Sequence, residues 1–360
     1  YYTLPNAATL HPRFVVTIML VIGCRSKSLK QWIGRNNRIS RTIRHESLLL
    51  VQPLKSGCLS SWLQPELLPE GWDHERITRD IIKSTEIGAI FKKMRPTLVP
   101  EDVEKLAVGP RKAKDLSFSN WETILSEIIV GDSFGVDRMD YLLRDSYHTG
   151  VPYGRFDHFR LIDTLRILPA GPDGADKPGL GVEEGGLQSA EALLLGRYYM
   201  YSQVYFHKNR RIYDIHLKDF LAAWLEGGKF PTNTDSHLKI TDNHVNTAIH
   251  DAALDQSANG HDAARRIAEH DHFKVLYQRH PDDVQVNRYA GHAIYEAAKL
   301  KFGPDNVRHD GPVEKKEEKN ADEPKKERTT FFPVLCRGDR IVDSGKLSEV
   351  LQKLPAVKWD

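Results

Sequence analysis

The stretch GVDRMDYLLRDSYHTGV, residues 135–151, places three acids and two arginines within an apolar helical pattern. On an α-helix, Asp137, Tyr141 and Asp145 follow one another at intervals of four residues and therefore share one face. The apolar members lie largely on the opposite side and are expected to pack into a core: Val136, Met139, Leu142 and Leu143. One face thus carries a carboxylate, a phenol and a second carboxylate. The alternative is a solvated face with ion pairs, such as Asp140 with Arg144.

The sequence around this stretch, from Gln64 onward, is that of a helical protein. Apolar residues recur at helical spacing over 72–91, over 120–130, where Ser119 or Asn120 is a plausible N-cap, and over 190–226. Residues 167–188 are rich in Gly, Pro and Asp, which predicts a β-hairpin or flap. The sequence therefore predicts a mainly α-helical core over residues 64–310 with a small β flap.

The segment that follows the core is divided by charge. Residues 311–330 have almost no apolar side chains and are expected to form a charged, disordered linker. The tail at 331–360 contains FFPVLC, a predicted strand, and KLSEVLQKL, a predicted helix. We expect a small α/β element there.

Composition excludes few classes of protein. Of 360 residues, 40% are hydrophobic and 28% charged, as in an ordinary globular protein. A net charge of +2 gives no global argument for a nucleic-acid or membrane surface, and the longest apolar run is about half a membrane span. Three distant cysteines form neither a zinc pattern nor a disulfide framework, which favours a reducing cytoplasm: Cys24, Cys58 and Cys336. Because the chain starts at Tyr1, we interpret it as a fragment.

The first 63 residues differ from the rest, because Glu46 is their only acid and their apolar residues follow no helical or strand period. Three interpretations are open: an ordinary basic subdomain, a targeting arm, or a segment translated out of frame.

The opening stretch resembles the fourth metal-site motif of the HD-domain phosphohydrolases, in the branch of the deoxynucleoside triphosphate (dNTP) triphosphohydrolases. The similarity includes D-[RK]-x-D-Y, then RD, then H-x-G-[VI]. WDHE at 72–75 is similar to the family's W-x-H-E segment, and residues 181–208, which end in VYFHK, resemble its flap and the long helix after it. The resemblance runs from about Gln64 to the end of the chain. It implies an HD-type helical bundle that hydrolyses a dNTP to deoxynucleoside and triphosphate with a divalent metal (Mn, Mg, Fe or Zn).

The resemblance also implies roles for individual residues. Asp137 matches a metal ligand, and His74 with Glu75 matches the catalytic His–acid pair. A substrate-binding role is implied for seven residues: Arg13, Arg138, Tyr141, Asp145, Arg197, Tyr205 and Lys208. Of these, Arg138 and Arg197 match phosphate-binding residues and Lys208 would add charge to that pocket. Tyr141 and Tyr205 would stack against the deoxyribose, and Asp145 would accept its 3′-hydroxyl.

The name-giving HD motif is absent from its expected place. LHPRFVV at 10–16 supplies His11, Arg13 and Phe14, but Val16 stands where the family has a metal-binding His, and no HD pair occurs between Val16 and Trp72. Three of the four expected metal ligands are therefore missing, although the spacing from Arg13 to His74 is about that of the family. We hypothesise that residues 15 to about 64 are out of frame or a degenerate HD half.

Two alternatives to an active hydrolase follow from that gap. A catalytically dead protein would still bind nucleotides or act as a regulatory protein. A nucleic-acid-binding protein would use the basic N-terminal arm. We expect a nucleoside triphosphate partner, a homo-oligomer, no membrane contact, and no bound metal in the chain as written. Nucleic acid is the less favoured partner.

Overall fold

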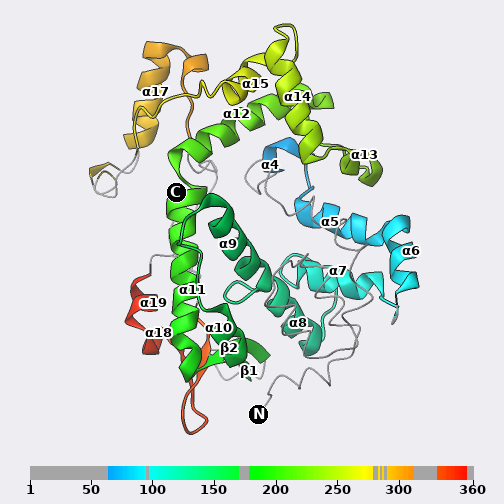
Figure 1. Cartoon of the computed structure of the whole chain (residues 1–360), viewed down its shortest axis with the longest axis vertical. Coiled ribbons are helices and arrows are strands. Elements are labelled where there is room, and N and C mark those ends of the chain that lie inside the picture. The colour runs from blue at the N-terminus through cyan, green and yellow to red at the C-terminus, as the bar shows by residue number, and fades with distance from the viewer. Residues whose placement is uncertain are drawn as a thin grey trace.

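The computed structural model describes residues 64–94, 97–169, 178–278, 290–310 and 331–354, with positions 283, 286 and 287. Within these ranges the chain is mostly helical with one small sheet, so the predicted fold class is confirmed (Figure 1). The predictions for residues 1–63, Arg13 among them, and for the linker at 311–330 lie outside the described residues. No helix in the described ranges is both long enough and apolar enough to cross a membrane.

The first described part of the chain forms five helices: α4 (Gln64–Leu67), α5 (His74–Lys83), α6 (Thr85–Lys93), α7 (Pro100–Val108) and α8 (Asn120–Val130). The helix predicted over 72–91 is in fact two helices, because Ser84 leaves the helical conformation and its side chain accepts a hydrogen bond from the Ile87 N–H. Of the two predicted N-cap candidates, Ser119 caps α8, in a reciprocal capping box with Glu122.

The central helices lie side by side, with α9 between α8 and α11 (Figure 1). The helical elements from α9 to α12 are α9 (Val136–Thr149), α10 (His158–Thr164), α11 (Leu187–Met200), the π-helical turn η2 (Tyr201–Tyr205) and α12 (Lys208–Trp224). The prediction of a single helix over 190–226 is therefore wrong. The chain leaves the helix at Phe206 and His207, and the His207 ring accepts the Asn209 N–H to start α12.

The flap and the tail form one sheet in the order β1-β2-β3-β4: β1 (Leu165–Pro169), β2 (Pro178–Glu183), β3 (Pro333–Leu335) and β4 (Ile341–Asp343). The two hairpins are antiparallel, and β2 pairs with β3 in parallel, with Val182 opposite Val334. Helices α18 (Ser344–Leu347) and α19 (Glu349–Lys353) complete the tail. Phe332 contacts Phe134 of the turn before α9 edge to face, with ring centroids 4.6 Å apart. The tail thus packs against the segment that precedes the central helix.

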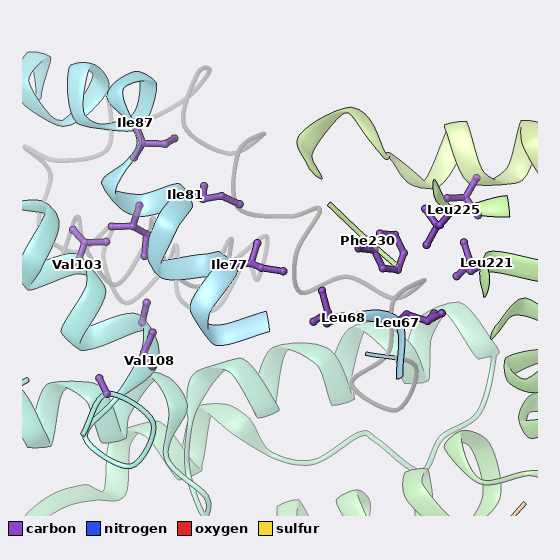
Figure 2. Packing of buried hydrophobic residues seen from close by; sticks show 14 of the residues in the cluster. Leu67, Leu68, Ile77, Ile81, Ile87, Val103, Val108, Leu221, Leu225 and Phe230 are labelled. Carbon is purple, nitrogen blue, oxygen red and sulfur yellow. The ribbon is translucent and has the colours of Figure 1, made fainter. Parts of the chain in front are cut away.

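The remaining elements follow α12: η3 (Glu226–Gly228), α13 (Thr234–Lys239), α14 (Asp242–Leu254), α15 (His261–Ala268), α17 (Ala290–Phe302) and η4 (Pro304–Asn306), with η1 (Glu184–Gly186) just before α11. One apolar core joins α5, α7 and α8 to α12, α14 and α15, and Figure 2 shows Leu67 and Leu68 of the α4 segment close to Phe230. A backbone hydrogen bond of 2.8 Å from the Phe230 N–H to the Leu67 carbonyl fixes that contact. A second core lies between α9, α11 and the sheet.

Candidate nucleotide site

Helix α9 sorts its side chains as its sequence predicts. Met139 and Leu142 are buried, at 3% and 0% exposure, and hold the helix against the second core. Asp140 pairs with Arg144 one turn later. The polar face with Asp137, Tyr141 and Asp145 is only partly buried.

Tyr205 and Asp145 meet at one end of this face. The Tyr205 hydroxyl donates to Asp145 Oδ2 across 2.8 Å, and the Tyr141 ring lies 6.2 Å from the Tyr205 ring, centroid to centroid. Burial, followed by the negative charge of Asp145, raises the pKa of Tyr205, and burial also raises the pKa of Tyr141. Both phenols are therefore neutral near pH 7. This end of the face offers one carboxylate, that of Asp145, and two aromatic rings.

The π-helical turn η2 carries Tyr205, which contacts Asp145 of α9. Arg197 and Tyr205 are eight residues apart and would share one face of a continuous α-helix. The wider turn at Tyr201–Tyr205 changes the phase of the helix, yet both side chains still contact α9 or the turn before it. The Tyr201 ring lies beneath the Arg197 guanidinium, 5.7 Å away, and 5.1 Å from the Tyr205 ring.

Arginines gather at the other end of the face, around Asp132 in the turn between α8 and α9. Arg138 Nη2 donates to Asp132 Oδ1 at 2.6 Å, and its Nε donates to the Gly131 carbonyl at 2.9 Å. Arg197 Nη1 donates to the Asp132 carbonyl at 3.1 Å. Burial and the neighbouring positive charge of Arg138 lower the pKa of Arg197, whose Nε is buried without a hydrogen-bond partner among the described residues. Two guanidinium groups that are not fully neutralised favour an anionic ligand.

His74 and Glu75 begin α5 and contact each other, with Nδ1 and Oε2 3.1 Å apart. Lys112, in the loop between α7 and α8, holds the other oxygen of Glu75 at 2.9 Å. Hydrogen bonding to Glu75 raises the pKa of Lys112, so this lysine is charged at neutral pH. Lys112 therefore holds the Glu75 carboxylate beside the imidazole, although Glu75 Oε2 itself has no hydrogen-bond partner among the described residues.

A single loop joins the His–Glu pair to the arginine cluster. Arg111, next to Lys112, pairs with Asp132 Oδ2, while Lys112 pairs with Glu75. Adjacent residues therefore contact the two halves of the site. Sequence reasoning missed Asp132, Arg111 and Lys112, because contacts between loops leave no periodic pattern in the chain.

The remaining predicted residues lie apart from this cluster or outside the described part of the chain. Lys208 is exposed at the start of α12, after the break at His207. Arg13 lies in the segment that is not described.

The described residues do not by themselves form a metal site. In the ranges that the structure describes, no three His, Cys, Asp or Glu side chains lie close enough together to hold a metal ion. Asp137 lies on the polar face of α9, and the described residues alone do not surround it with a donor set for a divalent cation.

Comparisons with known sequences identify one region. Residues 156–300 match the family described as HD associated region. The chain is similar to the uncharacterized protein YwfO of Bacillus subtilis, with 35% identity over 150 residues, which are 41% of this chain and 30% of YwfO. It is also similar to the uncharacterized protein MJ1154 of Methanocaldococcus jannaschii, with 39% identity over 107 residues, 30% of this chain and 23% of the relative. The chain thus matches less than a third of the length of either relative.

Solved structures share the fold over most of the chain. A hypothetical protein from Aquifex aeolicus has a TM-score of 0.61 and 27% identity, covering 95% of this chain and 78% of its own. A phosphohydrolase from Bacteroides thetaiotaomicron has a TM-score of 0.54 and 18% identity, covering 93% and 80%, and at that identity shows the fold alone. The chain therefore carries an HD-associated region within a helical fold that it shares with a phosphohydrolase, which supports the HD-domain family.

Proposed function

We propose that α9, α11 and η2 form the nucleotide pocket of an HD-type phosphohydrolase that acts on dNTPs. The observation that carries the proposal is the division of one helix face into two ends. Tyr205 donates to Asp145 at one end, while Arg138 and Arg197 surround Asp132 at the other. Arg138 and Asp145 are seven residues apart, roughly 10 Å along a helix. One end suits a sugar with a free hydroxyl, and the other suits phosphates.

Each end has a chemical role in this proposal. The guanidinium groups of Arg138 and Arg197 bind phosphate oxygens, and the buried Nε of Arg197, which has no hydrogen-bond partner among the described residues, gains one. Tyr141 and Tyr205 pack against the deoxyribose, and Asp145 accepts its 3′-hydroxyl. A ribose would add a 2′-hydroxyl beside two neutral phenols, so close packing there would favour the deoxy sugar.

His74 is the proposed proton donor in hydrolysis. Water adds to the α-phosphorus, the bond to the 5′-oxygen breaks, and that oxygen takes a proton to leave as the deoxynucleoside hydroxyl. Triphosphate is the other product. An imidazole whose Nδ1 lies 3.1 Å from the Glu75 carboxylate is suited to donate that proton near neutral pH.

A second candidate is nucleotide binding without hydrolysis. It is favoured by the absence of a metal-binding cluster within the described ranges and by the missing ligands of the sequence before Trp72. The two candidates share one pocket and differ only in turnover. A nucleic-acid role for the basic arm concerns residues 1–63 alone and stays the less favoured alternative.

The test separates binding from turnover. The protein is titrated with each dNTP by calorimetry, and triphosphate release is followed by anion-exchange chromatography with Mn²⁺ or Mg²⁺ present. Tyr205→Phe should weaken dNTP binding, whereas Tyr213→Phe, which removes a matched 2.8 Å hydrogen bond to His270, should not. Binding with triphosphate release supports the hydrolase, binding alone supports the second candidate, and no binding refutes both.

The oligomeric state stays a prediction from resemblance. Size-exclusion chromatography with light scattering tests the expected homo-oligomer, and repeating it with dNTP shows whether assembly depends on the ligand.

A further inference from the structure

The loop between α7 and α8 brings a third arginine to the phosphate end. Arg111 lies in this loop and pairs with Asp132 Oδ2, while Arg138 binds Oδ1 of the same carboxylate. Arg197 donates to the Asp132 carbonyl oxygen. Three positive side chains from three different elements therefore converge on one residue that carries a single negative charge.

The three arginines differ in how far their side chains are exposed to solvent. The Arg138 side chain is 20% exposed and the Arg111 side chain is 62% exposed. Arg197 is also partly buried, and its Nε is fully buried with no hydrogen-bond partner in the described part of the chain. Arg111 is thus the outermost cation, at the solvent side of the cluster.

The pairing of Arg111 with Asp132 is easily exchanged. Ion pairs between solvent-exposed side chains contribute little to stability, because water screens them and the long side chains lose freedom. A polyphosphate carries more negative charge than one carboxylate and accepts both arms of a guanidinium fork. Exchanging Asp132 for phosphate oxygens would therefore cost Arg111 little.

We propose that Arg111 is a specificity-determining residue that binds the outer phosphates of the nucleotide, with Asp132 holding its guanidinium near the pocket before the ligand arrives. This inference rests on the proposed nucleotide pocket and extends it to a substrate class. The pocket selects nucleoside triphosphates over monophosphates, because a monophosphate reaches only the inner arginines. Lys112, bound to Glu75, anchors the loop and keeps Arg111 at the mouth of the site.

The test compares ligands that differ only in phosphate number. Calorimetry measures the affinities of a dNTP, the matching dNMP and inorganic tripolyphosphate for the full chain and for Arg111→Gln. The control is Lys114→Gln, which removes one positive charge from the same loop at an exposed position. Circular dichroism verifies that each variant is folded, and Arg111→Lys tests the requirement for a fork.

The expected result is selective. Arg111→Gln should weaken dNTP and tripolyphosphate binding about tenfold, within the range for charge-assisted hydrogen bonds, and leave dNMP binding within about twofold. Lys114→Gln should change each affinity less than about twofold, and Arg111→Lys should fall between the full chain and Arg111→Gln.

Failure of this inference can be told apart from failure of the proposed function. If Arg138→Gln weakens dNTP binding but Arg111→Gln behaves like Lys114→Gln, the pocket stands and the role of Arg111 is refuted. An equal loss for dNMP and dNTP in Arg111→Gln also refutes it, since the arginine would then not read the outer phosphates. If the full chain binds neither dNTP nor tripolyphosphate, both proposals fall.

Discussion

A double-mutant cycle of Tyr205→Phe and Asp145→Ala measures the hydrogen bond that joins η2 to α9. The Tyr205 hydroxyl lies 2.8 Å from Asp145 Oδ2, and burial keeps the phenol protonated. A hydrogen bond to a charged group contributes about 1.5–3 kcal/mol net. Because the Asp145 side chain is 33% exposed and so partly screened by water, we expect a coupling of about 1–1.5 kcal/mol.

The assay is urea unfolding at pH 7 of the wild type, both single variants and the double variant. The difference between the double-variant effect and the sum of the single effects gives the coupling free energy. A matched cycle at the exposed pair Arg265–Glu269, one helical turn apart, should give a clearly smaller coupling, because water screens exposed ion pairs. The reasoning is refuted if the coupling of Tyr205 with Asp145 is no larger than that of this control.

Two further predictions concern buried charge. Glu104 is fully buried between Arg79 and Lys83, so Arg79→Met should lower the free energy of unfolding by about 2–3 kcal/mol, somewhat less than for a buried acid left with no partner. The exposed partner on the other side of Arg79 provides the control, because Asp115→Asn should lower the free energy of unfolding much less than Arg79→Met in the same urea titration. Burial and nearby arginines lower the pKa of His216, so the unfolded chain binds more protons and the free energy of unfolding should decrease as pH falls below about 6.5. His216→Phe should reduce that decrease, and an unchanged slope of unfolding free energy against pH would contradict this account.

Local pattern was sufficient for most of the helices. The apolar stripe of α8 and its N-cap both depend on neighbours within four residues, so the sequence predicts the stripe and limits the N-cap to Ser119 or Asn120 without tertiary information. The same holds for the polar face of α9, because helical spacing alone places Asp137, Tyr141 and Asp145 together.

The breaks between helices were not predictable in this way. Ser84 divides one apolar pattern into α5 and α6, and a π-helical turn followed by His207 divides α11 from α12. In both places the apolar spacing continues across the break. The chain bends there because packing on both sides outweighs the small local preference for an unbroken helix.

The sequence by itself determined the mainly helical class, the flap hairpin and which residues share the polar face of α9, since these depend on contacts close along the chain. Only the tertiary structure decided that β3 of the tail pairs with β2 of the flap. It also decided that Tyr205 reaches Asp145 and that Arg111, Arg138 and Arg197 converge on Asp132. These contacts join segments distant in sequence, and their geometry follows from how the helices pack, which no periodicity within one helix specifies.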